Sequence, residues 1–205
     1  MRSKVGISVE CILKGERTKD LANIIEAIYR TESTISNADE YVPYMLPLKI
    51  MNALEDDVIF VNDFEYIDNE KVLYVEFIDT DAVPKLSFYS ELAKFYDLKL
   101  YLSAVCEDDE IFFNTDEEGE YFPEKYYFNI YLDFVPRFTS LLEKLGKILE
   151  EYGVYYSDLE PFQENLKEYG IETEEDMYSL QSYLQSAYPS VTVYFSHFVN
   201  PLSKK

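Results

Sequence analysis

Residues 72–113 constrain the fold of this chain more than any other stretch. Apolar residues within it alternate with the period of a half-buried strand at Leu98, Leu100, Leu102 and Ala104. Just upstream, apolar residues have helical spacing at Phe88, Leu92 and Phe95. The stretch therefore predicts a strand, a turn containing Pro84, a helix, a second strand, an acidic turn and a third strand.

The residues before this stretch add a strand, a helix and a hairpin. Strict alternation predicts a first strand at Val5, Ile7, Val9, Cys11 and Leu13. An amphipathic helix follows at residues 21–28. Segments 58–66 and 72–78 are β-branched and aromatic, and the Asp and Asn between them favour a hairpin turn. We expect Asp81 to cap the helix after the hairpin.

This order of elements is β-α-β-β-α-β, which usually folds into an antiparallel sheet with two helices on one face. The chain therefore predicts an α+β, ferredoxin-like fold, with extra strands at 111–115 and 126–132. After Pro136 the apolar spacing becomes helical from Phe138 to Tyr152. We expect a ferredoxin-like domain at 1–135 and a helical extension at 136–205, ending in a strand and packed on the first domain.

Charge limits the partners of such a chain. Its 205 residues include 40 acidic and 18 basic ones, a net charge of −22. The segment 55–120 alone holds 20 acidic and 4 basic residues, a net charge of −16. Such a surface repels nucleic acids and anionic membranes and attracts basic proteins. A halophilic or merely soluble protein is the alternative, although the large aromatic and apolar content argues against halophily.

Tyrosine is the second excess, with 20 Tyr, 14 Phe and no Trp. Tyrosine combines a large contact area with a polar tip, which suits interfaces. Codon bias in an AT-rich genome is the alternative. The same bias would also raise the lysine content, which is low here, so we favour selection for an acidic, aromatic surface.

Metal binding is a weaker interpretation of the acidic clusters. Residues 114–119 resemble the start of an EF-hand loop, but the twelfth place is Lys125, Pro123 interrupts the loop and strands flank it. Asp79 and Asp81 could share a divalent ion with the 107–110 turn only if the two turns met. We predict no metal and no cofactor.

Catalytic motifs are absent from the sequence. The chain has one histidine, His197, in an apolar segment, and it has no P-loop, no dinucleotide-binding glycine motif and no nucleophile elbow. Carboxylate pairs resembling those of glycosidases arise by chance in a chain this acidic. The sequence therefore predicts that the protein is not an enzyme.

Two cysteines, Cys11 and Cys106, lie at inward positions of predicted strands. Buried, reduced thiols are typical of a cytosolic protein. The first residues lack the apolar core of a signal peptide, and no apolar run is long enough to span a bilayer. We therefore expect a cytoplasmic protein.

A short pattern resembles the YubB ferredoxin-like family of plasmids, phages and other mobile elements. It comprises Phe77-Ile78-Asp79-Thr80, Pro84, Leu92-Ala93, Tyr96 and Phe112, and Cys11 to Gly15 is similar to the first strand and glycine turn of that family. The resemblance covers roughly residues 4–115, and the tryptophan of the family's turn is missing. It implies a ferredoxin-like fold and a mobile-element setting, and it carries over no catalytic residue.

Together these features predict an inhibitor of a host defence system, either a CRISPR effector or a restriction nuclease. It would cover the basic nucleic-acid-binding surface of that protein as a DNA or RNA mimic, in the host cytoplasm. The alternatives are an immunity protein or antitoxin that neutralises a basic toxin, and a divalent-metal-dependent enzyme. The residues predicted to bind the partner are Asp79, Asp81, Glu107, Asp108, Asp109, Glu110, Asp116, Glu117, Glu118, Glu120 and Tyr121.

Overall fold

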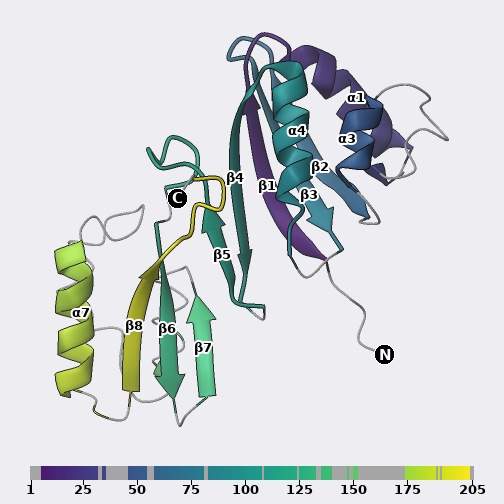
Figure 1. The fold of residues 1–205 in the computed structure, drawn as a ribbon. Coiled ribbons are helices and arrows are strands. Elements are labelled where there is room, and N and C mark those ends of the chain that lie inside the picture. The colour runs from purple at the N-terminus through teal and green to yellow at the C-terminus, as the bar shows by residue number, and fades with distance from the viewer. Residues whose placement is uncertain are drawn as a thin grey trace, which may run out of the picture. The chain divides into compact units, whose positions relative to one another are not determined.

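A computed structural model gives the fold of the chain (Figure 1). It describes residues 6–31, 34–35, 46–54, 58–80, 83–107, 109–123, 125–132, 135–139, 147, 150–151, 174–187, 189 and 191–203. The chain divides into two compact units. The first unit is Met1–Thr115 with Asn200–Lys205, and the second is Asp116–Val199.

The first unit is built on a five-stranded sheet in the order β2-β3-β1-β4-β5, and every neighbouring pair is antiparallel. The strands are β1 (Ile7–Lys14), β2 (Ile59–Ile67), β3 (Val72–Asp79), β4 (Lys99–Cys106) and β5 (Ile111–Asn114). Its helices are α1 (Thr18–Arg30), α3 (Leu48–Asn52) and α4 (Leu86–Tyr96). This confirms the predicted α+β class, the hairpin and the strand at 111–115.

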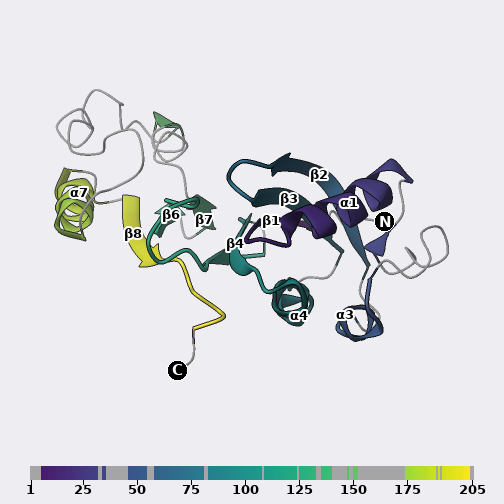
Figure 2. The ribbon, with the colours of Figure 1, turned by 90° about the horizontal axis from the view of Figure 1, so that it is seen from above.

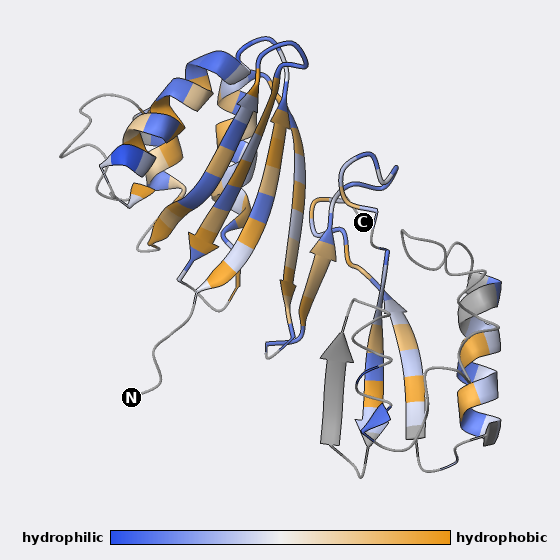
Figure 3. Cartoon of the chain, turned by 180° about the vertical axis from the view of Figure 1, so that it is seen from behind, coloured by the Kyte–Doolittle hydropathy of each residue, from blue (hydrophilic) through white to orange (hydrophobic). Residues whose placement is uncertain are grey.

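The helices lie on one face of this sheet, as the views in Figures 1 and 2 show. The alternation that predicted β1 places Ile7, Val9, Cys11 and Leu13 in the core. The apolar stripe of α1 packs against them through Leu21, Ile25 and Ile28, and α4 does so through Phe88, Tyr89 and Leu92. Figure 3 shows the opposite face, where hydrophilic and hydrophobic residues are interleaved along the strands.

The start of α4 differs from the prediction. The helix begins at Leu86, and its N-cap position is Lys85 rather than Asp81. The backbone N–H of Lys85 donates to Asp79 Oδ2 over 2.8 Å. The carboxylate at the end of β3 therefore satisfies a backbone donor at this turn, and Asp81 itself lies outside the described residues.

The second unit contains a three-stranded antiparallel sheet in the order β7-β6-β8. Its strands are β6 (Tyr126–Leu132), β7 (Val135–Thr139) and β8 (Val191–His197), and α7 (Glu174–Ala187) packs against β8. Tyr178 of α7 lies edge-on to Phe195 of β8, with ring centroids 4.8 Å apart.

Two features of this unit differ from the predicted division at residue 135. First, β6 pairs with β8 over its whole length, so residues 126–132 group with the C-terminal part of the chain. Second, Pro136 lies within a strand, opposite Tyr131. Proline is tolerated there because β7 is an edge strand. Most of the predicted helical stripe at 138–152, and the helix expected from Pro161, lie outside the described residues.

Candidate protein-binding face of the five-stranded sheet

Two of the predicted partner-binding carboxylates are buried. Asp79 is 0% exposed and Asp116 is 3% exposed. Asp79 accepts the backbone N–H of Lys85, as described above. Neither side chain is therefore placed on a surface that a partner protein can contact.

Asp116 organises the loop that follows it. Its Oδ1 accepts the backbone N–H of Gly119 over 3.1 Å. Its Oδ2 accepts the N–H groups of Tyr121 and Phe122 over 2.6 and 3.0 Å. Burial acts to raise the pKa of Asp116, but these backbone hydrogen bonds outweigh it and lower the pKa. Gly119 has a φ of 72°, which the turn requires and which glycine adopts without strain.

The remaining predicted residues lie in two turns that belong to different units. In the turn between β4 and β5, Glu107 is half-buried and Asp109 and Glu110 are exposed. In the second unit, Tyr121 is half-buried, and the acidic residues of its loop are exposed: Glu117, Glu118 and Glu120. Asp108 lies outside the described residues.

A stronger candidate is the face of the five-stranded sheet opposite α1, α3 and α4, on which the described part of the chain places no helix; we call it the helix-free face. Side chains at directly opposite positions of neighbouring strands project to the same face. Glu10 of β1 is opposite Ser103 of β4 on one side and Glu76 of β3 on the other. Glu76 is in turn opposite Asp63 of β2. Three carboxylates therefore form one row across three adjacent strands, and we call Glu10, Glu76 and Asp63 the acidic row.

Glu76, in the middle of the acidic row, is held on both sides. Ser8 Oγ donates to its Oε1 over 2.5 Å, and Asn62 Nδ2 donates to its Oε2 over 2.7 Å. Asn62 is available because the pairing of β2 with β3 shifts between Val61 and Asp63, which leaves one extra residue at a β-bulge. The two donors therefore fix the position of the Glu76 carboxylate on this face.

The acidic row carries an electrostatic cost for the folded chain. Like charges at directly opposite positions of neighbouring strands destabilise a sheet. Here Glu10 is opposite Glu76, and Glu76 is opposite Asp63. Positive charge on a partner would be attracted to this line of carboxylates.

Aromatic side chains accompany the acidic row on the same face. The next register line contains Tyr101, Ile12, Tyr74 and Glu65 on four successive strands. Ile12 is only 3% exposed although none of the described helices lies on this face, and a tyrosine flanks it on each neighbouring strand. The face thus combines exposed carboxylates with half-buried tyrosines, a composition suited to a protein interface.

Sequence reasoning missed this face because it looked for runs of acidic residues. Glu10, Glu76 and Asp63 come from three strands that are far apart in the sequence. The sequence does hold a signal for this face, namely an acidic residue between the apolar residues of an alternating strand, as at Glu10 within β1.

Comparisons with protein-family models, with curated proteins and with solved structures find no match to this chain. Among the described residues, no group of three or more His, Cys, Asp or Glu side chains is placed to hold a metal ion. None of the described helices is both long and apolar enough to cross a membrane. The chemistry of the sheet face is therefore the basis for a proposed function.

Proposed function

We propose that this protein binds a basic, nucleic-acid-binding surface of another protein through the helix-free face of its five-stranded sheet. The acidic row is the single observation that carries this proposal. Its three carboxylates lie on adjacent strands, with Tyr74 and Tyr101 on the neighbouring register line. Neighbouring strands are about 4.8 Å apart, so the row presents three negative charges within about 10 Å. Such a line of charge can take the place of backbone phosphates against lysine and arginine side chains.

The partner we favour is a host defence protein, either a CRISPR effector or a restriction nuclease, which this protein inhibits by occupying the groove for DNA or RNA. Both kinds of nuclease carry basic grooves for nucleic acid. The net charge of −22 supports this choice because it disfavours direct binding of nucleic acid by the protein itself.

We further propose that the first unit is a ferredoxin-like domain. Its first six main elements follow the order β-α-β-β-α-β if the short α3 is set aside, and β1 and β3 form the centre of the four-stranded part. The strand β5 then extends the sheet beside β4. Together with the resemblance of residues 4–115 to the YubB family, this supports an origin in a mobile element and action in the host cytoplasm.

Two other functions use the same carboxylates. An immunity protein or antitoxin would present the same face to a basic toxin. A divalent-metal-dependent enzyme would instead need metal affinity, which calorimetric titration with Mg²⁺, Mn²⁺ and Ca²⁺ measures directly. Binding no tighter than millimolar would end the enzyme alternative.

The test of the proposed function is binding and inhibition of purified CRISPR effectors and restriction nucleases at several salt concentrations. The sheet variant neutralises exposed carboxylates of the face with Glu10→Gln, Asp63→Asn and Glu65→Gln. The matched control neutralises three exposed carboxylates of the second unit with Glu150→Gln, Glu151→Gln and Glu175→Gln.

We expect the sheet variant to bind at least tenfold more weakly, about 1.4 kcal/mol, and to lose inhibition. The control should stay within about threefold of the wild type, because its loss of net charge is the same but its position is not. Wild-type association should slow as salt rises. Equal losses in the two variants, or binding that is insensitive to salt, would show that the sheet face is not the binding surface.

A further inference from the structure

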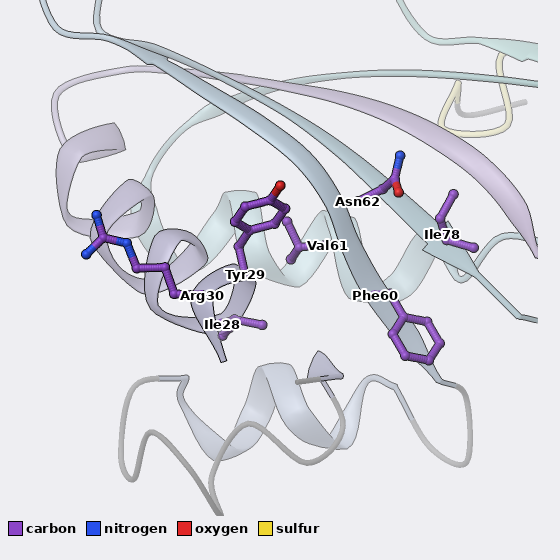
Figure 4. Close-up of a pocket in the computed structure, with 7 residues that line it drawn as sticks. All are labelled: Ile28, Tyr29, Arg30, Phe60, Val61, Asn62 and Ile78. Carbon is purple, nitrogen blue, oxygen red and sulfur yellow. The ribbon is translucent and has the colours of Figure 1, made fainter. Parts of the chain in front are cut away.

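A hollow lies at one end of the acidic row, where the last turn of α1 meets the edge strand β2 (Figure 4). Its volume is about 550 Å³. Most of its lining is apolar, from Ile28, Tyr29, Phe60, Val61 and Ile78. Its size and lining suit an apolar side chain of a bound molecule.

Two side chains that line the hollow, Tyr29 and Arg30, are fixed by contacts with neighbouring residues. The ring of Tyr29 packs edge-on against Phe64 with centroids 5.4 Å apart. Arg30, which also lines the hollow, pairs with Glu26 one turn earlier on α1, so its charge is compensated within the helix. Phe60 remains 39% exposed. The exposed ring of Phe60 is thus a surface that a ligand can cover.

The hollow adjoins an edge of the sheet. β2 is nine residues long, and β3 is its neighbour in the sheet among the strands that the structure describes. On its other side, a single bridge between Thr34 and Phe60 is the pairing found within the described part of the chain. An edge strand presents backbone N–H and C=O groups that an extended peptide can pair with.

Charge decides which peptide would bind there. Asp63 and Glu65 are exposed on β2, beside the hollow and at the end of the acidic row. A second copy of this chain would bring the same carboxylates against its own and would be repelled. A segment with lysine or arginine at alternate positions would instead place its charges opposite Asp63 and Glu65.

We propose that β2 accepts an extended, basic segment of the partner as an added strand, with one apolar side chain of that segment in the hollow. This inference rests on the proposed function, because both require a basic partner. Side chains of a strand alternate between its two faces. On the face of the acidic row, β2 presents Phe60 as well as Asp63 and Glu65, because Phe60 is opposite Ile78 and Ile78 is opposite Ser8. The lysine or arginine side chains of the added strand would therefore lie beside Asp63 and Glu65, and one apolar side chain on the same face would enter the hollow beside Phe60.

The probe is a synthetic nine-residue peptide that alternates lysine and valine and has phenylalanine at its centre. A peptide with glutamate in place of lysine is the charge control. Binding to the full chain is measured by calorimetry, and the strand that is covered is identified by amide hydrogen exchange. We expect the lysine peptide to slow exchange in β2 and the glutamate peptide to have no effect.

The hollow is tested with Phe60→Ala, and Phe95→Ala on α4 is the matched control because Phe95 is a similarly exposed ring, at 46%. We expect Phe60→Ala to weaken the lysine peptide about tenfold and Phe95→Ala to leave its affinity within twofold. Equal effects of the two variants, no binding of the lysine peptide, or protection of strands other than β2 would overturn the inference.

The two proposals fail in different ways. If the sheet variant loses nuclease binding while Phe60→Ala keeps it, the added strand is wrong and the proposed function stands. If the lysine peptide protects β2 but no nuclease is bound or inhibited, the edge site stands and the proposed function is wrong.

Discussion

Tyr89 lies in the core of the first unit with its hydroxyl group buried and without a hydrogen-bond partner among the described residues. The side chain is 0% exposed. Its ring packs edge-on against Phe88 and Phe77, with centroids 5.1 and 5.5 Å away. Burial raises the pKa of Tyr89, and the nearby Asp79 and Cys11 act in the same direction, so the phenol stays neutral. Replacing Tyr89 by phenylalanine removes the hydroxyl and keeps the ring.

We expect Tyr89→Phe to stabilise the protein. In the unfolded chain the hydroxyl bonds to water, and burying it without a partner costs about 1–3 kcal/mol. Removing it also loses a little packing around one oxygen atom. The net gain in the free energy of unfolding should be about 1 kcal/mol, which raises the melting temperature by about 2–4 °C for a chain of this size.

The assay is urea unfolding followed by circular dichroism, combined with amide hydrogen exchange of β1 and β3, which reports on the first unit. Tyr96→Phe is the control, because Tyr96 is buried on the same helix and its hydroxyl is not one of the buried atoms that lack a partner. The control should show no gain. A loss of more than about 0.5 kcal/mol in Tyr89→Phe would refute the reasoning, because it would mean that the hydroxyl has a partner.

Three further predictions concern other carboxyl and thiol groups. Asp116→Ala should destabilise the second unit by about 2 kcal/mol, because three backbone N–H groups lose their charged acceptor. Hydrogen exchange of the Tyr121 and Phe122 amides measures this loss of stability. Unchanged protection of these amides would contradict the prediction. Burial raises the pKa of the Cys11 thiol, so its contribution to stability is complete below the pKa of the unfolded thiol and is lost as pH rises. Between pH 8.5 and 10, the free energy of unfolding should therefore fall by about 2 kcal/mol more in the wild type than in Cys11→Ala. Urea unfolding at each pH measures this fall, and an equal fall in both proteins would show that the buried thiol does not cause it. Glu10→Gln should raise stability at low salt by about 0.5 kcal/mol while weakening partner binding, and a loss of stability would show that repulsion from Glu76 is not significant.

Local patterns predicted the first unit well because each strand and helix there buries an apolar face of its own. β1 alternates strictly between core and outer positions, and the spacing of α4 gives one buried stripe. The predicted cap of α4 is wrong, because the carboxylate nearest to the helix in the sequence, Asp81, is not its N-cap. In the structure the Lys85 N–H bonds instead to Asp79, six residues earlier.

The second unit was harder to predict because its pairing is distant in the sequence. Tyr126 pairs with His197, and alternation along β6 does not say which strand lies beside it. The helical spacing after Pro136 predicts no strand there, yet Pro136 lies in β7, because an edge strand tolerates proline. The division of the chain into units depends on these pairings and not on local composition.

The sequence predicted an acidic contact surface in the turns, which stays a prediction, and it did not predict the face of the sheet proposed above. Charge counts predicted an acidic surface, and several acidic residues of the turns, such as Asp109 and Glu118, are indeed exposed. They could not show that Asp79 and Asp116 are used internally as acceptors of backbone N–H groups. They also could not show the acidic row, because strand register brings its members together.

The last residues of the chain, Asn200–Lys205, group with the first unit, so Asp116–Val199 is an insertion with a covalent connection at each end. A cut at the first connection would divide the chain into 1–115 and 116–205, whereas a cut at the second connection would release only the short segment 200–205. Limited proteolysis followed by mass measurement can therefore separate the two units without redesigning either of them.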